Sequence, residues 1–403
     1  MPKKALTNKS ISYIIVVVLK FYTLNKNMGL SQKNDRRNTM KKIISVFLCI
    51  AMLATCCVAF ASCGKKTFEI AVVTDVGQLM DGGFNQGTYE GAKAYAEKNG
   101  LTYKYYQPDN GSNANDNDRI AAMRQAINNG AKIIVTPGFL QETAIKTVAK
   151  ENPDVKFVFV DGWALGLDNV TAITYKEQEC GYMAGYAVVK EGYTKLGYTG
   201  GGGGANPACN RFGYGFVQGA EAAAKELGKN VTIKYSYKYG DGFSASPELQ
   251  TQIAGWYAAG TEVVFSCGGS MLQSVKSAAA EYPNAKIVGV DTDQSAQSAQ
   301  IITSAMKELA VSVQQVLGQF YADKWDAELA NKVQDLGAAD NATGLPTAKD
   351  SWKFSKFTVA EYTELFNKIK DGTIVPVSKV PEAANYGEWL SEGLTNTTID
   401  FEK

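Results

Sequence analysis

Short apolar runs alternate with amphipathic stretches along the chain from residue 68 onward. In the first half, the apolar runs cover 68–76, 103–107, 131–138 and 155–162, and helical patterns cover 88–100, 118–130 and 142–153. Near-continuous apolar strands that alternate with helices are typical of a parallel sheet covered on both faces. The pattern therefore predicts an α/β unit in this half of the chain.

The same alternation returns in the second half. Apolar runs cover 195–201, 231–237, 261–269 and 285–293, and helical patterns cover 213–228, 246–260 and 273–283. Two successive α/β units of similar length predict two similar lobes. In such folds a ligand binds where the carboxyl ends of the strands face a shared cleft.

The last part of the chain reads differently. Residues 330–351 are polar and loop-like, and 358–372 form a final helical pattern. No long linker separates the two α/β units, so we expect the chain to cross between the lobes more than once. A length of 403 residues agrees with two lobes, since it is about twice what one compact domain usually needs.

Composition limits the function classes. Hydrophobic residues make up 45% and charged residues 20%, as in ordinary globular proteins, and the net charge of +1 gives no reason to expect nucleic acid as a partner. Histidine is absent, which removes the commonest general base and the commonest metal ligand. Cys180, Cys209 and Cys267 are not at metal-ligand spacing, and we expect three small buried thiols.

An export signal is predicted at residues 40–62. Two lysines follow Met40, an apolar stretch covers 43–61, and the small residue Ser62 precedes Cys63. This order is typical of a secretory signal peptide with its cleavage site. A plain transmembrane anchor is the alternative, but it would need about 20 apolar residues without an early cleavage signal.

The residues around Cys63 resemble the lipobox of bacterial lipoproteins. In that motif the cysteine is diacylated and becomes the new N-terminus, so Cys63 is the expected lipidation site. Phe60 stands where lipoproteins usually carry leucine. A second apolar run lies within 11–22, ahead of the signal. Because a signal peptide normally begins at the initiator methionine, we expect translation to start at Met40 and residues 1–39 not to belong to the protein.

Motifs at the strand ends resemble one family along nearly the whole chain after residue 68. The opening motif covers 74–100, and the resemblance continues in the family's order through 136–139, 160–162, 211–228, 240–248, 266–269, 289–295 and 303–307. The family is that of the basic membrane protein lipoproteins, which include purine-nucleoside receptors. The chain departs from it in the polyglycine run, residues 200–204, and in the Gly82-Gly83 pair, where the family more often has a polar residue.

The resemblance implies a type I periplasmic-binding-protein fold with two doubly wound parallel-sheet lobes, three hinge crossovers and closure around a ligand. The expected N-terminal lobe comprises 68–176 and 294–328, and the expected C-terminal lobe comprises 177–293 and 329–400. The resemblance further implies an ABC permease and an ATPase as partners. We expect a monomer on the extracytoplasmic face of the cell membrane, held there by a lipid anchor.

Candidate ligand contacts in the first half are Asp75, Phe84 and Asn85. Asp75 ends the first strand, where a carboxylate can accept hydrogen bonds from a base or a ribose diol, although a helix-capping role is the alternative. Phe84 follows two glycines in a loop, where stacking on a nucleobase would explain an exposed ring. Its alternative role is a hydrophobic staple for the next helix. Asn85 offers both a donor and an acceptor to a heterocycle edge.

Two aromatic residues of the second half are also candidates. Phe243 again follows glycines and precedes a helix, so it could provide the opposite face of an aromatic sandwich with Phe84. Phe212 follows the polyglycine run and could form a pocket wall, or equally pack in the core under its own helix.

Charged residues complete the candidate site. Asp161 and Asp291 each end a buried strand, which is where doubly wound folds place ligand contacts. Lys307 could donate to a ribose hydroxyl while its charge offsets Asp291, or it could be a solvated lysine. Gly268 would allow the backbone to approach a ligand closely. Asp291 with Asp293 is not a full oxygen cage, so we expect no metal.

Cofactor motifs are absent. Residues 200–205 satisfy the dinucleotide-binding pattern formally, but Pro207 follows before any helix, and the chain contains no P-loop. We therefore expect no cofactor and no enzymatic activity, and the leading hypothesis is a purine-nucleoside receptor for import. A sugar-binding receptor of the same fold and a membrane-associated nucleoside sensor stay open. An enzyme would need a nucleophile with a partnered base, and no such pair is evident.

Overall fold

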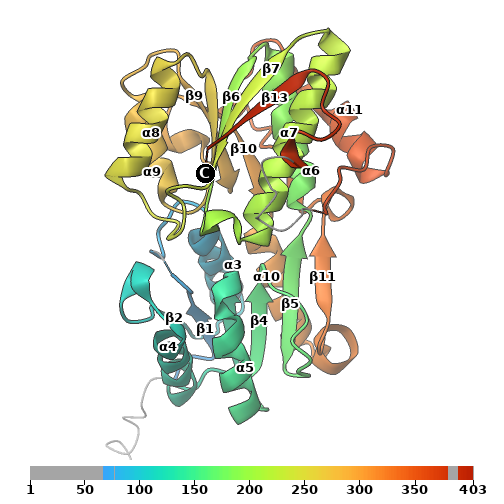
Figure 1. Ribbon diagram of the computed structural model, residues 1–403. Coiled ribbons are helices and arrows are strands. Elements are labelled where there is room, and N and C mark those ends of the chain that lie inside the picture. Colours follow the sequence, from blue (N-terminus) through green and yellow to red (C-terminus); the bar gives the residue numbers. More distant parts are fainter. Residues whose placement is uncertain (1–66, 77, 380–388, 403) are drawn as a thin grey trace, which may run out of the picture. The chain divides into compact units, whose positions relative to one another are not determined.

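The computed structural model describes residues 67–76, 78–379 and 389–402 (Figure 1). The expected signal peptide at 40–62, the lipidation site Cys63 and residues 1–39 lie outside the described residues. Within the described ranges, every helix is too short or too polar to cross a membrane.

The first sheet is formed by six parallel strands in the order β11-β5-β4-β3-β1-β2. The strands are β1 (Ile70–Val73), β2 (Tyr103–Tyr106), β3 (Ile133–Pro137), β4 (Lys156–Val160), β5 (Val170–Tyr175) and β11 (Val333–Leu336). Helices α3 (Phe84–Lys98) and α10 (Leu309–Tyr321) share an apolar core with one face, and α4 (Asp116–Asn128) and α5 (Glu142–Glu151) share another with the opposite face.

The alternation of side chains along β1 shows why helices cover this sheet on both faces. Ile70 and Val72 belong to the core under α3 and α10, whereas Ala71 and Val73 belong to the core under α4 and α5. Successive side chains of a strand point to opposite faces, so a strand that is apolar at every position requires helices on both.

The second sheet has the strand order β12-β10-β9-β8-β6-β7-β13. Its strands are β6 (Lys195–Gly200), β7 (Val231–Ser236), β8 (Val263–Cys267), β9 (Lys286–Asp291), β10 (Ile301–Lys307), β12 (Thr343–Gly344) and β13 (Thr397–Glu402). All pairs are parallel except β10 with β12. Helices α6 (Glu177–Glu191) and α7 (Pro207–Leu227) cover one face, and α8 (Pro247–Ala258) and α9 (Met271–Ala279) cover the other. Helix α11 (Val359–Lys370) packs beside α6.

The described strands show that the chain passes between the two sheets three times. It leaves the first sheet after β5, returns to it after β10, and leaves it again after β11 (Figure 1). The two doubly wound lobes and the expectation of more than one crossing are thereby confirmed.

The positions of two crossings differ from those expected. Residues 294–328 were assigned to the first lobe, but β10 pairs with β9 in the second sheet, and only α10 packs on the first. Residues 329–400 were assigned to the second lobe, but β11 pairs with β5 in the first sheet. The segment 330–351 is therefore not simply a loop. These crossings occur at the ends of regular strands, where no change in composition marks them.

Candidate functional site

The carboxyl ends of strands from both sheets surround one cavity of about 640 Å³, which includes its opening to solvent. All nine residues that the sequence nominated as ligand contacts line it. They are Asp75, Phe84, Asn85 and Asp161 from the first lobe, and Phe212, Phe243, Gly268, Asp291 and Lys307 from the second. Their role as ligand contacts stays a prediction.

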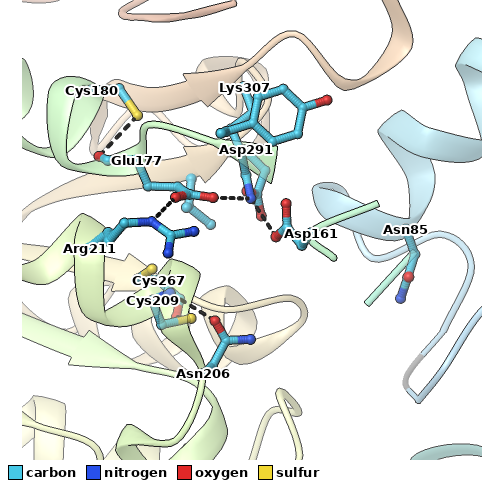
Figure 2. A network of polar contacts seen from close by, with 12 residues as sticks. Asn85, Asp161, Glu177, Cys180, Asn206, Cys209, Arg211, Cys267, Asp291 and Lys307 are labelled. Atoms are coloured by element: carbon cyan, nitrogen blue, oxygen red, sulfur yellow. Dashed lines mark hydrogen bonds and ion pairs between the residues drawn. The ribbon is translucent and has the colours of Figure 1, made fainter. Parts of the chain in front are cut away.

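Lys307 lies at the centre of the charged part of the site. Its Nζ is 2.7 Å from Asp161 Oδ2 and 3.4 Å from both Glu177 Oε1 and Asp291 Oδ1 (Figure 2). Asp161 follows β4 of the first lobe, Asp291 ends β9 of the second, and Glu177 opens α6 just after the first crossing. The ammonium group therefore joins carboxylates from both lobes and from the hinge.

Aromatic rings enclose the same ammonium group. Lys307 Nζ is 5.0 Å from the ring centroid of Phe84 and 5.3 Å from those of Tyr175 and Phe212. Cations are attracted to aromatic faces at such distances, especially where water is excluded. The side chain of Lys307 is only 1% exposed, so the alternative of a solvated lysine does not hold.

Glu177 links Lys307 to a second cation. Its fully buried carboxylate also contacts Arg211 Nε at 2.5 Å (Figure 2). Burial acts to raise the pKa of Glu177, but the charges of Arg211 and Lys307 outweigh it and lower the pKa below its usual value. Burial likewise acts to lower the pKa of Lys307, but Asp161, Asp291 and Glu177 raise it well above its usual value. Glu177 and Lys307 are therefore both charged at neutral pH.

The pKa values of Asp161 and Asp291, the two aspartates at strand ends, are raised, whereas that of Glu177 is lowered. Burial raises the pKa of Asp161 and of Asp291 to about 6, against the lowering effect of Lys307. Both have left-handed backbone conformations, with φ of 57° and 67°, and Phe243 has φ of 54°. Such values are uncommon outside glycine and often occur at binding sites, because the surrounding structure must hold them.

Some polar atoms at the cavity have no partner. Among the described residues, Asp161 Oδ1 and Asn85 Oδ1 are buried and accept no hydrogen bond. Buried polar atoms are normally paired, so an orphaned acceptor beside a cavity indicates a place for a ligand donor. Asn85 is fixed through its other amide atom, because Nδ2 donates to the backbone oxygens of Val76 and Gln78 at 3.3 and 3.4 Å.

Asp75 has a different environment from the other carboxylates. Its Oδ1 accepts the backbone N–H of Val76 at 2.6 Å, and Arg119 donates to its backbone oxygen at 3.4 Å. Burial raises the pKa of Asp75 to about 7. Near neutral pH this carboxyl group can therefore either donate to a ligand or accept from it.

The loop that presents Phe84 is organised by Asp81, which the sequence did not nominate. The carboxylate of Asp81 accepts the backbone N–H groups of Gly83, Asn85 and Gln86 at 2.9, 3.0 and 3.2 Å. It thus satisfies free donors at the start of α3. Phe84 is the first residue of that helix, half-buried against the first-lobe core.

The polyglycine run lies under Phe243. A Cβ on Gly201 would come within 2.4 Å of two carbons of the Phe243 ring, so the ring packs directly on the glycine backbone. Phe212 is 2% exposed and packs edge-on against Phe265 in the second-lobe core, as its alternative role proposed. It nevertheless lines the cavity as well.

Sequence reasoning missed several other residues at the site. Phe139, Asn206, Cys209 and Cys267 line the cavity, and Glu177 and Arg211 lie behind it. Phe139 could have been found, because it follows a glycine at the end of β3 as Phe84 follows one after β1.

Asn206 caps α7 by accepting the backbone N–H of Cys209 at 2.9 Å. The expectation of buried free thiols at Cys180, Cys209 and Cys267 is confirmed.

Asp293 faces away from Asp291. Its carboxylate accepts hydrogen bonds from the Ser295 backbone and from the hydroxyl of Ser351, while Asp291 pairs with Lys307. In the described ranges, no group of three acidic, cysteine or histidine side chains is arranged to hold a metal ion.

A family model for PnrA-like ABC transporter substrate-binding proteins matches residues 68–382. The chain is 30% identical to the ABC transporter nucleoside-binding protein BmpA of Lactococcus lactis subsp. cremoris, over 69% of this chain and 84% of that protein. It is 25% identical to an uncharacterized lipoprotein of Pyrococcus horikoshii, over 84% of each chain.

A solved structure gives the same picture of the fold. An ABC transporter solute-binding protein from Aeropyrum pernix superposes with a TM-score of 0.66 at 21% identity, over 81% of this chain and 97% of that chain. The α/β fold with two parallel-sheet lobes, as in type I solute-binding proteins of ABC transporters, is thereby confirmed.

Proposed function

The chain belongs to the PnrA-like family of ABC transporter substrate-binding proteins, and on that premise we propose that it binds a purine nucleoside in the cavity between its lobes. The observation that carries the proposal is the combination of half-buried aromatic rings with orphaned acceptors at one cavity. Phe84 and Phe243 line it together with Asn85 and Asp161. Aromatic rings can stack on a flat base, and carboxylates can accept from ribose hydroxyls.

The charges of the site favour a nucleoside over a nucleotide. Lys307 is already within 3.4 Å of three carboxylates, and Arg211 is paired with Glu177. A phosphate would find no unpaired cation among the residues lining the cavity, and it would meet Asp161 and Asp291. Bringing like charges together in a buried site is costly. An uncharged ribose with donor hydroxyls suits this site better.

The relatives support the same class of ligand. The protein from Lactococcus lactis is named as nucleoside-binding, and its match covers most of both chains. A sugar receptor would also use aromatic rings and acidic groups, so a hexose is the alternative outcome that the experiment must separate.

Membership of this family also indicates which proteins the chain works with and where in the cell it lies. A substrate-binding protein of an ABC transporter delivers its ligand to a permease that is driven by an ATPase. We propose that this chain does so as a monomer, anchored by lipid at Cys63 on the extracytoplasmic face of the membrane. A relative named as a lipoprotein and the lipobox-like residues around Cys63 support the anchor.

Mass spectrometry of the ligand released from the purified full-length protein tests the proposal. The protein is exposed beforehand to an equimolar mixture of adenosine, guanosine, inosine, their 5′-monophosphates and glucose, and is then washed and denatured. We expect a purine nucleoside in the released fraction, without its monophosphate. Release of glucose alone, or of a monophosphate in preference to its nucleoside, would contradict the proposal.

A further inference from the structure

Three side chains of the second lobe donate to one backbone oxygen of the first. The carbonyl of Gly82 accepts from Thr292 Oγ1 at 3.0 Å, from Gln294 Nε2 at 2.9 Å and from Gln297 Nε2 at 3.2 Å. Gly82 lies in the loop before α3 of the first lobe. The three donors lie between β9 and β10 of the second lobe, so all three hydrogen bonds bridge the cleft.

This convergence exceeds what a carbonyl needs. A carbonyl oxygen has two lone pairs, and one donor is usually enough to satisfy it. Each lobe also has its own apolar cores on both faces of its sheet, so these hydrogen bonds join two units that are each packed separately. The arrangement therefore acts on how the lobes meet.

Gln294 is fixed in place for this contact. It is 1% exposed, its Oε1 accepts the backbone N–H of Val290 at 2.9 Å, and its own backbone N–H donates to Ser304 Oγ at 3.1 Å. With the acceptor atom of the amide occupied inside the second lobe, the donor atom points across the cleft. A donor held rigidly in advance loses little entropy when the bond forms.

The left-handed backbone of Gly82 and its lack of a side chain leave room for the donors. Its φ of +70° lies in the left-handed region, and a Cβ there would come within 2.5 Å of Gln297 Nε2. A Cβ on Gly83 would come within 3.4 Å of Gln294 Nε2. Gly82 and Gly83 therefore lie where side chains of the second lobe approach the first lobe closely.

The contact also bears on the ligand site. Gly82 lies between Asp81, which caps α3, and Phe84, which lines the cavity. We propose that Gly82, Thr292, Gln294 and Gln297 form an interlobe latch, which holds the lobes closed and positions Phe84 and Asn85 at the cavity. The latch does not depend on which ligand binds.

A latch of this kind acts on the opening of the two lobes. Its hydrogen bonds exist only while the lobes are closed, so weakening it increases the open population of the ligand-free protein. A bound ligand must wait for opening in order to leave. The latch therefore slows dissociation, and it also slows association, because a ligand can enter only the open fraction of the ligand-free protein.

Hydrogen–deuterium exchange of the full-length, ligand-free protein tests the latch with the double variant Thr292→Val, Gln297→Met. Both substitutions keep approximate shape and remove a donor, while Gln294 is left to support its own lobe. We expect peptides covering 78–87 to exchange about tenfold faster than in the wild type, since two ordinary hydrogen bonds correspond to about 5- to 150-fold in an equilibrium.

Gln300→Ala is the matched control. The Gln300 amide donates to the carbonyls of Ala279, Tyr282 and Ala285 at 2.8 to 3.1 Å, entirely within the second lobe. It should leave exchange in 78–87 unchanged even if it lowers the midpoint of thermal unfolding. Wild-type exchange of 78–87 in the double variant, or equal acceleration in Gln300→Ala, would overturn the latch.

Dissociation of guanosine, followed by stopped-flow displacement, gives a second readout. We expect the dissociation rate constant to rise about tenfold in the double variant, and the apparent association rate constant to rise with the open population of the ligand-free protein. An unchanged dissociation rate constant would overturn the latch. If none of adenosine, guanosine and inosine binds to the wild type, the proposed function is in question, and the exchange experiment still decides the latch.

Discussion

At the scale of single residues, Asp291 offers the sharpest test of the ribose subsite. It ends β9 in a left-handed conformation, pairs with Lys307 and lines the cavity. Asn also tolerates left-handed backbone, so Asp291→Asn keeps the loop while removing a strong acceptor. We expect nucleoside affinity to fall by about 1.5–3 kcal/mol, the range for hydrogen bonds to charged groups.

The corresponding free base should lose less affinity, because it lacks the ribose. Titration calorimetry with guanosine and guanine measures both losses. Asp293→Asn is the matched control, since that carboxylate faces Ser295 and Ser351 and should leave the difference between nucleoside and base unaltered. Equal losses for guanosine and guanine in Asp291→Asn would place Asp291 outside the ribose subsite.

The aromatic pair gives a second prediction at this scale. Phe84→Leu and Phe243→Leu keep apolar area but remove a planar surface on which a base can stack. Each should weaken guanosine binding by about 1–3 kcal/mol, and the double variant should lose less than the sum because both rings act on one ligand. Phe320→Leu, a half-buried ring of α10 away from the cavity, serves as the control in the same calorimetric titrations. Wild-type affinity in both single variants would refute the sandwich.

Strand ends explain why these residues could be nominated from sequence. The carboxyl ends of parallel strands gather at one edge of each sheet, and in a two-lobed fold the two edges face one cleft. Asp75 and Asp161 of the first sheet and Asp291 of the second could therefore be expected near one another without a structure. Glu177 and Arg211 could not be found in this way. Their pairing depends on α6 and α7 lying side by side, and no local pattern encodes it.

At the scale of elements, the polyglycine loop makes a testable contact with the site. The ring of Phe243 packs on Gly201, and a Cβ there would come within 2.4 Å of it. Gly201→Ala should therefore displace the ring and weaken guanosine binding by about 1–3 kcal/mol, as loss of one stacking partner would. Gly242 lies in the neighbouring loop, and a Cβ added there would have no neighbouring heavy atom within 4 Å. Gly242→Ala should therefore bind guanosine as the wild type does in the same titration. If the two variants bind guanosine equally well, the loop does not support Phe243.

The first turn of α6 connects the crossings between the lobes. Glu177 pairs with Lys307 at the end of β10, and Glu179 Oε2 accepts from the backbone of Ala338 at 2.6 Å and from Thr343 Oγ1 at 3.0 Å. Carboxylates are favoured at a helix N-terminus by the helix dipole. Helix α6, which follows the first crossing, is thereby linked to the segments at the other two crossings.

The same helix shows the limit of sequence patterns. The pattern did not predict α6, whose Gly181 and Gly185 lower helix propensity. A Cβ on either would come within 2.3 Å of a backbone oxygen of α7, at Phe212 and Phe216 respectively. These glycines serve tight packing between two helices, which is a tertiary requirement. Strands with a clear apolar run, such as β1, β3 and β8, were predictable because their burial is complete along the run.

At the scale of the whole molecule, the lipid anchor is testable through Cys63. If Cys63 carries the diacylglyceryl group, Cys63→Ala should move the protein from the membrane fraction to the soluble fraction. A two-chain anchor gives stable attachment, whereas a single acyl chain binds only marginally. Immunoblots of fractionated cells measure the distribution, with Cys57→Ala as the control that should stay in the membrane. Membrane retention of Cys63→Ala would argue against lipidation at this residue.

The central claim is that two lobes of one solute-binding protein close on a purine nucleoside. Isothermal titration of the wild-type protein with adenosine, guanosine, inosine and glucose, after removal of any retained ligand, tests it most directly. We predict saturable binding of at least one of the three nucleosides and no binding of glucose. Saturable binding of glucose without binding of any nucleoside would contradict both the aromatic sandwich and the proposed function.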